Sequence, residues 1–196
     1  DGAITVDAGG QITATDVASL TDNDTNDVSL TTTAGDIAVG TVTAGSAGDA
    51  TLNAAANITD DGSALTVLEA DVLTANAGGS VTLDTTVDSA NVSTSAAGDI
   101  DIDETDAIVL TDVDTSDGAV TVDAGGQITA TDVDSSATDD DSNDITLTST
   151  GAGIEAQLVV AGSSNDVTLD AQGGAITENG DAGADVVGDV LTADAA

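Results

Sequence analysis

A 17-residue segment that occurs twice constrains the fold of this chain more than any other feature. Residues 1–17 read DGAITVDAGGQITATDV and residues 117–133 read DGAVTVDAGGQITATDV, so the copies differ only by Ile4 against Val120. Chance does not produce a match of this length. The chain is therefore a repeat protein with a long period of about 116 residues.

Within each copy, aliphatic and polar residues alternate. Ile4 and Val6 are separated by Thr5, the glycines at positions 9 and 10 interrupt the pattern, and the alternation resumes at Ile12. Successive side chains of a β-strand point to opposite faces, and glycine adopts the conformations that a tight corner needs. The segment therefore predicts two short strands joined by a glycine corner.

The same arrangement recurs along the chain as a series of turns. In each turn, an aliphatic pair two residues apart is followed eight to eleven residues later by another aliphatic residue. Most turns are spaced by about 19–25 residues, and they begin at Ile4, Val28, Ala50, Val81, Ile100, Val120, Ile145 and Val167. A coil of this length with two or three short strands is typical of a parallel β-helix. We therefore predict an all-β parallel β-helix, or β-solenoid.

We expect residues 1–196 to form a single continuous solenoid, with a first super-repeat over residues 1–116 and a partial second one over residues 117–196. EADVLTANA at positions 69–77 and GDVLTADAA at positions 188–196 support a period of about 116–118 residues, or five turns. The inward residues of the two motif copies should lie inside the same solenoid: Ile4, Val6, Ile12, Val120, Val122 and Ile128.

A string of β-sandwich domains is the alternative fold, because sandwiches also contain short strands at even spacing. Such sandwiches usually bury a large aromatic residue or a disulfide. This chain has no aromatic residue and no cysteine, so its core must be built from Val, Ile, Leu and Ala. The turn spacing and the glycine corners favour the solenoid.

The charge of the chain excludes several functions. There is no Lys, Arg or His against 37 acidic residues, for a formal net charge of -37. Such a surface repels nucleic acid and anionic membranes, and the apolar runs fall far short of the ~20 residues of a membrane span. Catalysis by a nucleophile and base drawn from His, Cys or Lys is excluded, so we expect no enzyme. Trypsin-like proteases have no cleavage site, which favours an extracellular or cell-surface location.

The repeats resemble those of a known family. Residues 28–62, VSLTTTAGDIAVGTVTAGSAGDATLNAAANITDDG, are similar to the repeat regions of filamentous-haemagglutinin-type bacterial adhesins. The likeness extends over essentially the whole chain. It implies a secreted exoprotein whose shaft is a right-handed parallel β-helix.

Acidic clusters are the main ligand signal. Hard oxygen ligands suit Ca²⁺, although neither an EF-hand loop nor the glycine-rich calcium nonapeptide occurs. A solvated acidic face with diffuse counter-ions is the alternative interpretation. The candidate metal ligands are Asp22, Asp24, Asp99, Asp101, Asp103, Asp139 and Asp141.

The sequence therefore favours a structural segment of an extracellular filament or adhesin shaft that requires no cofactor. We expect its partners to be cations and either further copies stacked end to end or a continuation of the same chain. Three alternatives remain: a calcium-dependent module, an ice-binding module with threonine pairs such as Thr146 and Thr148, and a polysaccharide hydrolase that uses paired carboxylates.

Overall fold

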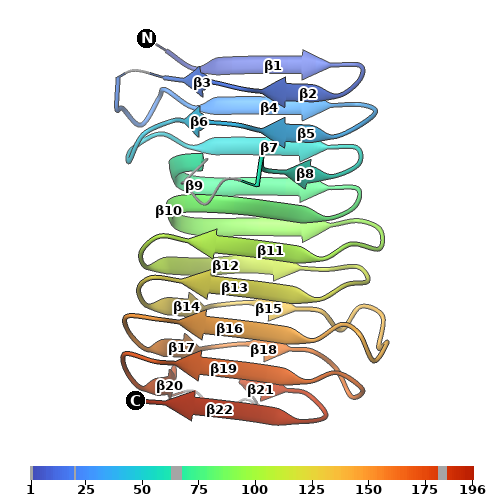
Figure 1. Ribbon diagram of the computed structural model, residues 1–196, viewed down its shortest axis with the longest axis vertical. Helices are drawn as coiled ribbons and strands as arrows, with labels where there is room; N and C mark the ends of the chain where they lie inside the picture. Colours follow the sequence, from blue (N-terminus) through green and yellow to red (C-terminus); the bar gives the residue numbers. More distant parts are fainter. Residues whose placement is uncertain (1, 20, 63–67, 181–184) are drawn as a thin grey trace.

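The protein, analysed as a computed structural model, is a β-solenoid of about eight turns (Figure 1). The structure describes residues 2–19, 21–62, 68–180 and 185–196, and over these residues the chain forms 22 strands and no helix. Every pair of neighbouring strands among them is parallel. The predicted fold class is therefore confirmed.

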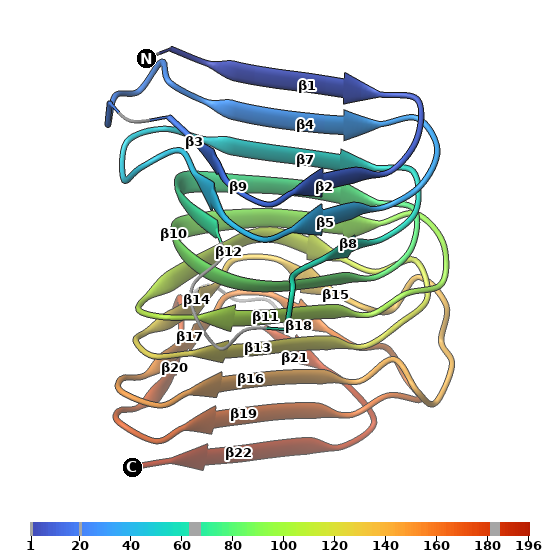
Figure 2. The ribbon, with the colours of Figure 1, turned by 45° about the horizontal axis from the view of Figure 1, so that its top comes forward.

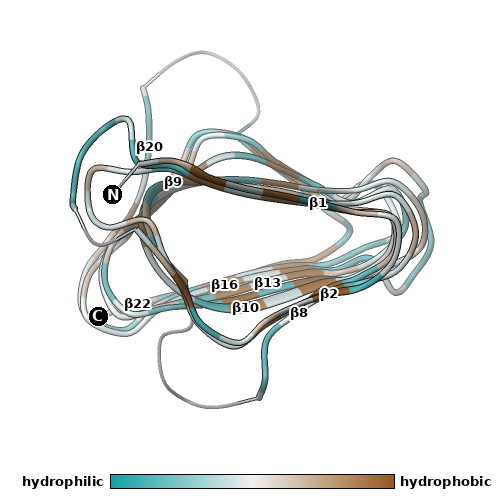
Figure 3. Ribbon diagram, turned by 90° about the horizontal axis from the view of Figure 1, so that it is seen from above, coloured by the Kyte–Doolittle hydropathy of each residue, from teal (hydrophilic) through white to brown (hydrophobic). Residues whose placement is uncertain are grey.

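Each turn is flattened, so two faces of the solenoid oppose each other across the core (Figure 3). The first face begins with long strands: β1 (Ile4–Ala8), β4 (Val28–Thr32), β7 (Ala50–Ala54) and the second halves of β9 (Leu68–Ala77) and β10 (Val81–Thr94). It continues through β12 (Ile108–Asp114) into pairs of short strands: β14 (Ile128–Ala130) with β15 (Val133–Asp134), β17 (Ile154–Ala156) with β18 (Val159–Val160), and β20 (Ile176–Glu178) with β21 (Val186–Val187).

The second face has the opposite order: from the N-terminal to the C-terminal end of the stack, its short strands come first and its long strands follow. Its short strands are β2 (Ile12–Ala14) with β3 (Val17–Ala18), β5 (Ile37–Val39) with β6 (Val42–Thr43), and β8 (Ile58–Thr59) with the first half of β9. Its long strands are the first half of β10, then β11 (Ile100–Glu104), β13 (Val120–Ala124), β16 (Ile145–Ser149), β19 (Val167–Ala171) and β22 (Leu191–Ala195). Figure 2 shows the two faces separated at the N-terminal end, with β1 and β4 on one and β2 and β5 on the other.

The core is a stack of aliphatic layers. In the long strands of the interior turns every second residue is buried, as in β4, where Val28 and Leu30 are fully buried. Residues of the same position stack from turn to turn, so that Ile12, Ile37 and Ile58 lie in register. Burying each such side chain contributes about 1.5–3 kcal/mol, but only when the neighbouring turns cover it.

The end turns show the effect of a missing neighbour. Ile4 is only half-buried and Val6 is 37% exposed, whereas Val120, Val122 and Ile128 are fully buried. The prediction that Val6 lies inside the solenoid is therefore wrong, because its side chain is exposed. The side chain is on the inward side of β1, but no turn covers it.

The two copies of the motif lie on opposite faces. Register partners can be followed from each turn to the next, one turn per step. Five such steps lead from Ile12 to Val120, which therefore occupies the second face. Five steps from Ile4, on the first face, lead instead to Leu110. The two motif copies are thus about five and a half turns apart, and the expected separation of five turns is wrong by half a turn.

Strands β9 and β10 accomplish this exchange of faces. β10 is 14 residues long; its first part pairs with β8 and β11 on the second face, and its last part pairs with β9 and β12 on the first. As a result, the loop before β4 and the loop before β16 project from opposite sides of the stack (Figure 1).

The glycine corner explains how turns stack so closely. A Cβ atom on Gly125 would lie 2.0 Å from the backbone oxygen of Thr105 in the preceding turn. No side chain fits in that space, so the corner requires glycine. A Cβ atom on the equivalent Gly9, in the first turn, would have no atom within 4 Å.

Candidate functional site

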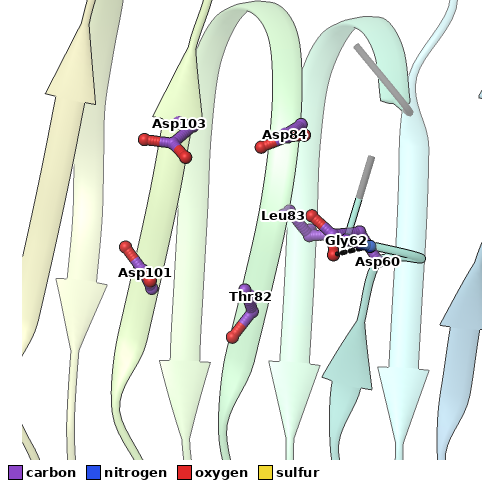
Figure 4. Close-up of a pocket in the computed structure, with 7 residues that line it drawn as sticks. All are labelled: Asp60, Gly62, Thr82, Leu83, Asp84, Asp101 and Asp103. Atoms are coloured by element: carbon purple, nitrogen blue, oxygen red, sulfur yellow. Dashed lines mark hydrogen bonds between the residues drawn. The ribbon is translucent and has the colours of Figure 1, made fainter. Parts of the chain in front are cut away.

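Four aspartates line an open groove on the second face. The groove measures about 280 Å³, and its walls include Asp60, Asp84, Asp101 and Asp103 (Figure 4). Asp60 follows β8, Asp84 belongs to β10, and the other two belong to β11. Two of the predicted metal ligands, Asp101 and Asp103, are thus brought together with two aspartates that the sequence did not single out.

Strand alternation and register create this cluster. Asp84, Asp101 and Asp103 occupy outward positions that alternate with buried residues along β10 and β11. In-register parallel pairing places Asp103 between Asp84 on one side and Asp123 on the other. Neighbouring strands are about 4.8 Å apart, so identical charges are held at this spacing along the face.

The carboxylates of the groove perturb one another. Burial raises the pKa of Asp84, and the neighbouring charges of Asp60 and Asp103 raise it further. Burial also raises the pKa of Asp101, followed by repulsion from Asp103 and Asp123. The chain has no basic side chain to offset this repulsion. The groove therefore attracts cations and retains protons more strongly than isolated aspartates do.

A second acidic cluster lies on the first face and was not anticipated. Burial raises the pKa of Asp114 to about 6, and the charges of Asp112, Asp132 and Asp134 add to the effect. Asp114 and Asp134 are register partners on neighbouring turns. The tripeptide Asp-Val-Asp at positions 112–114 and again at 132–134 was the signal that could have revealed it.

Three other predicted metal ligands, Asp22, Asp99 and Asp139, accept hydrogen bonds from residues of the next turn. Asp22 accepts hydrogen bonds from the Ser46 hydroxyl and the Ala47 N–H, both at 2.8 Å. Asp99 accepts one from the Ala119 N–H at 2.9 Å. These carboxylates thus fasten one turn to the next.

Asp139 is the equivalent of Asp22 in the second half of the chain. It accepts hydrogen bonds from the N–H groups of Ser163 and Ser164, each at 2.9 Å, and from the Ser163 hydroxyl at 2.5 Å. The bond from the Ser163 hydroxyl, with those from the backbone, lowers the pKa of Asp139. The sequence signal is the AGS tripeptide found at positions 44–46 and 161–163.

The remaining two predicted ligands, Asp24 and Asp141, are exposed in these loops. Across the part of the chain that the structure describes, no three acidic side chains are grouped so that they could hold a metal ion.

Glu104 differs from the other acids because it points into the core. It is 5% exposed, at an inward position of β11 whose register partners are Thr85 in β10 and Ala124 in β13. Its carboxylate accepts hydrogen bonds from the Thr85 hydroxyl at 2.8 Å and from the N–H groups of Val87 and Asp106, each at 3.1 Å. Burial raises the pKa of this carboxyl despite the three donors. The alternation of IDIDE at positions 100–104 is the sequence signal for this inward position.

A threonine ladder runs along the outer surface of the second face. Four threonines stack in register, but the neighbouring outward positions carry Asp123, Asp170 and Asp194, and the ladder ends at Asp101. The charged neighbours interrupt any continuous array of hydroxyl groups. The ladder consists of Thr121, Thr146, Thr168 and Thr192.

These features define the class of the protein as a parallel β-solenoid with an acidic outer surface. Comparison with known proteins gave no match: no family model, no curated protein sequence and no solved structure is significantly similar to this chain. Within the described residues, no helix has the length and apolar character needed to cross a membrane.

Proposed function

We propose that this chain is a structural segment of an extracellular filament or adhesin shaft and not an enzyme. The observation that carries the proposal is the continuity of the stack. Each interior turn pairs with the turn before and the turn after it, and one aliphatic core runs between the two faces. In such a solenoid every added turn extends both the core and the hydrogen-bonded ladders, which suits a rod.

The groove chemistry also supports a non-catalytic role. A carboxylate hydrolase needs one acid that keeps its proton and one base that stays ionised, which requires different environments. Asp84 and Asp101 have pKa values raised by the same causes, burial first and neighbouring carboxylates second. These two carboxyls are therefore not set apart from each other for acid and base roles.

The extracellular part of the proposal depends on the composition and on the adhesin resemblance. A chain without Lys or Arg resists trypsin-like proteases, and its charge of -37 keeps it hydrated and apart from anionic membranes. Antibody labelling of intact and permeabilised source cells tests the location. We expect label on intact cells, and label confined to permeabilised cells would contradict the proposal.

The shaft function can be tested with a tandem fusion. Two copies joined directly in one polypeptide should form a single straight rod, of about twice the length of one copy, in small-angle X-ray scattering. A matched fusion with a long Gly/Ser linker should form a jointed particle. A direct fusion that is equally jointed would contradict the shaft function.

A further inference from the structure

We infer that the two ends of this solenoid bind each other head to tail, so that β1 of a second copy docks on β20 of the first. This inference rests on the proposed shaft function and names the partner as another copy of the same chain. It is carried by the exposure of the end turns, the shape of the C-terminal end and an internal precedent for the contact.

Both ends expose residues that are buried in the interior turns. At the N-terminal end, Val6 is 37% exposed, while its register partner Leu30 is fully buried. At the C-terminal end, Leu191 is 54% exposed, while its register partner Val167 is fully buried. Each end therefore presents an apolar layer that one more solenoid turn would cover.

The C-terminal end is hollowed where this layer is open. A groove of about 510 Å³ lies there, and its apolar wall is formed by Leu169, Ile176, Val186 and Leu191. These residues come from both faces, from β19 and β22 on one side and from β20 and β21 on the other. The groove thus lies between the two faces.

The chain contains its own example of the contact that would close this groove. In the interior, ITDDG at positions 58–62 is followed by LTANA at positions 73–77, and Val81 then stacks on Ile58. The last turn has the same order, with ITENG at positions 176–180 followed by LTADA at positions 191–195. The segment ITVD at positions 4–7 matches VTLD at positions 81–84, so Ile4 of the second copy takes the place of Val81 and stacks on Ile176.

The rest of the contact follows from the coil. Because β22 lies half a turn beyond β20 and β21, the next strand must extend the first face, and β1 is the first strand of the incoming copy. β2 and β3 then cover β22, as the last part of β10 covers residues 73–77. Such an interface joins different surfaces and does not close, so it propagates into a filament.

Charge controls this association. Each copy carries a net charge of -37 with no basic residue, so two copies repel at low ionic strength. Salt at about 1 M shortens the screening length to ~3 Å and leaves the apolar contact in control. Association should therefore be measured at high salt.

The experiment uses sedimentation velocity and negative-stain electron microscopy of the 196-residue chain at about 1 M NaCl. The parent should form chains that lengthen with concentration. Val6→Asp should block the N-terminal end and Leu191→Asp the C-terminal end, each weakening association by about 100-fold or more because a charge would be buried without a partner. Val109→Asp is the matched control, since Val109 is 38% exposed on the side of the solenoid and should have no effect.

Mixing gives the sharpest result. An equimolar mixture of the two blocked variants should stop at heterodimers, because only one pair of intact ends remains. A parent that stays monomeric at high salt, equal losses in the Val109→Asp control, or chain growth in the mixture would each overturn head-to-tail docking. A monomeric parent whose tandem fusion is still a straight rod would overturn the docking alone and leave the shaft function standing.

Discussion

Replacing Asp114 by asparagine should stabilise the protein at neutral pH and have little effect at acid pH. Asp114 lies among Asp112, Asp132 and Asp134, and burial together with their charges raises its pKa to about 6. The chain has no basic residue that could pair with the cluster. At neutral pH the fold therefore holds an ionised carboxylate in an unfavourable site.

The direction follows from proton binding. Asp114 has a pKa of about 6 when folded against 3.8 as the ordinary value, so the folded state binds the proton more tightly. Its stability contribution is complete below about pH 4 and is lost as the pH rises through about 6. At ~1.4 kcal/mol per pKa unit the upper bound is about 3 kcal/mol, and solvent screening of this partly exposed group reduces it to on the order of 1 kcal/mol.

Thermal melts followed by circular dichroism measure the effect. The Asp114→Asn variant should melt about 2–4 °C above the parent near pH 7.5, and the difference should vanish near pH 4. Asp141→Asn, in an exposed loop, is the control for removing one charge from a highly acidic chain. The same gain at both pH values, or an equal gain in the control, would refute the reasoning.

Three further predictions concern the corner, the buried acid and the net charge. Gly125→Ala should cost about 1–3 kcal/mol in urea unfolding because its Cβ would meet the Thr105 oxygen, whereas Gly9→Ala, at the open end, should cost much less; equal losses would contradict this account. Glu104→Ala should be about 1–3 kcal/mol less stable than Glu104→Gln, since the glutamine oxygen can still accept from the Thr85 hydroxyl and the Val87 N–H, whereas alanine leaves the buried Val87 N–H without its acceptor; urea titrations giving equal midpoints would exclude that role. Raising NaCl from about 0.05 to about 1 M should raise the melting temperature through screening of like charges, so a melting temperature that ignores salt would show that these acids are too well solvated to matter.

The solenoid could be predicted because its information is local. Alternation such as Ile100, Ile102 and Ile108 marks which side chains point inward, and a turn with one apolar side can be stable only against another turn. The glycine corners and the duplicated motif then give the length of a turn. These features depend on residues close together in the chain, so they are visible without coordinates.

Which residues stack on which was decided only by the tertiary structure. Asp84 meets Asp103 because the turn between them spans 19 residues, and Asp114 meets Asp134 because theirs spans 20. Loops of different length change such partners without changing the alternation, so the sequence predicted clusters of neighbours along the chain where the fold builds clusters across turns. The exchange of faces in β10 was hidden for the same reason: each half of that strand alternates correctly, and only its pairing partners show that the pattern has moved half a turn around the axis.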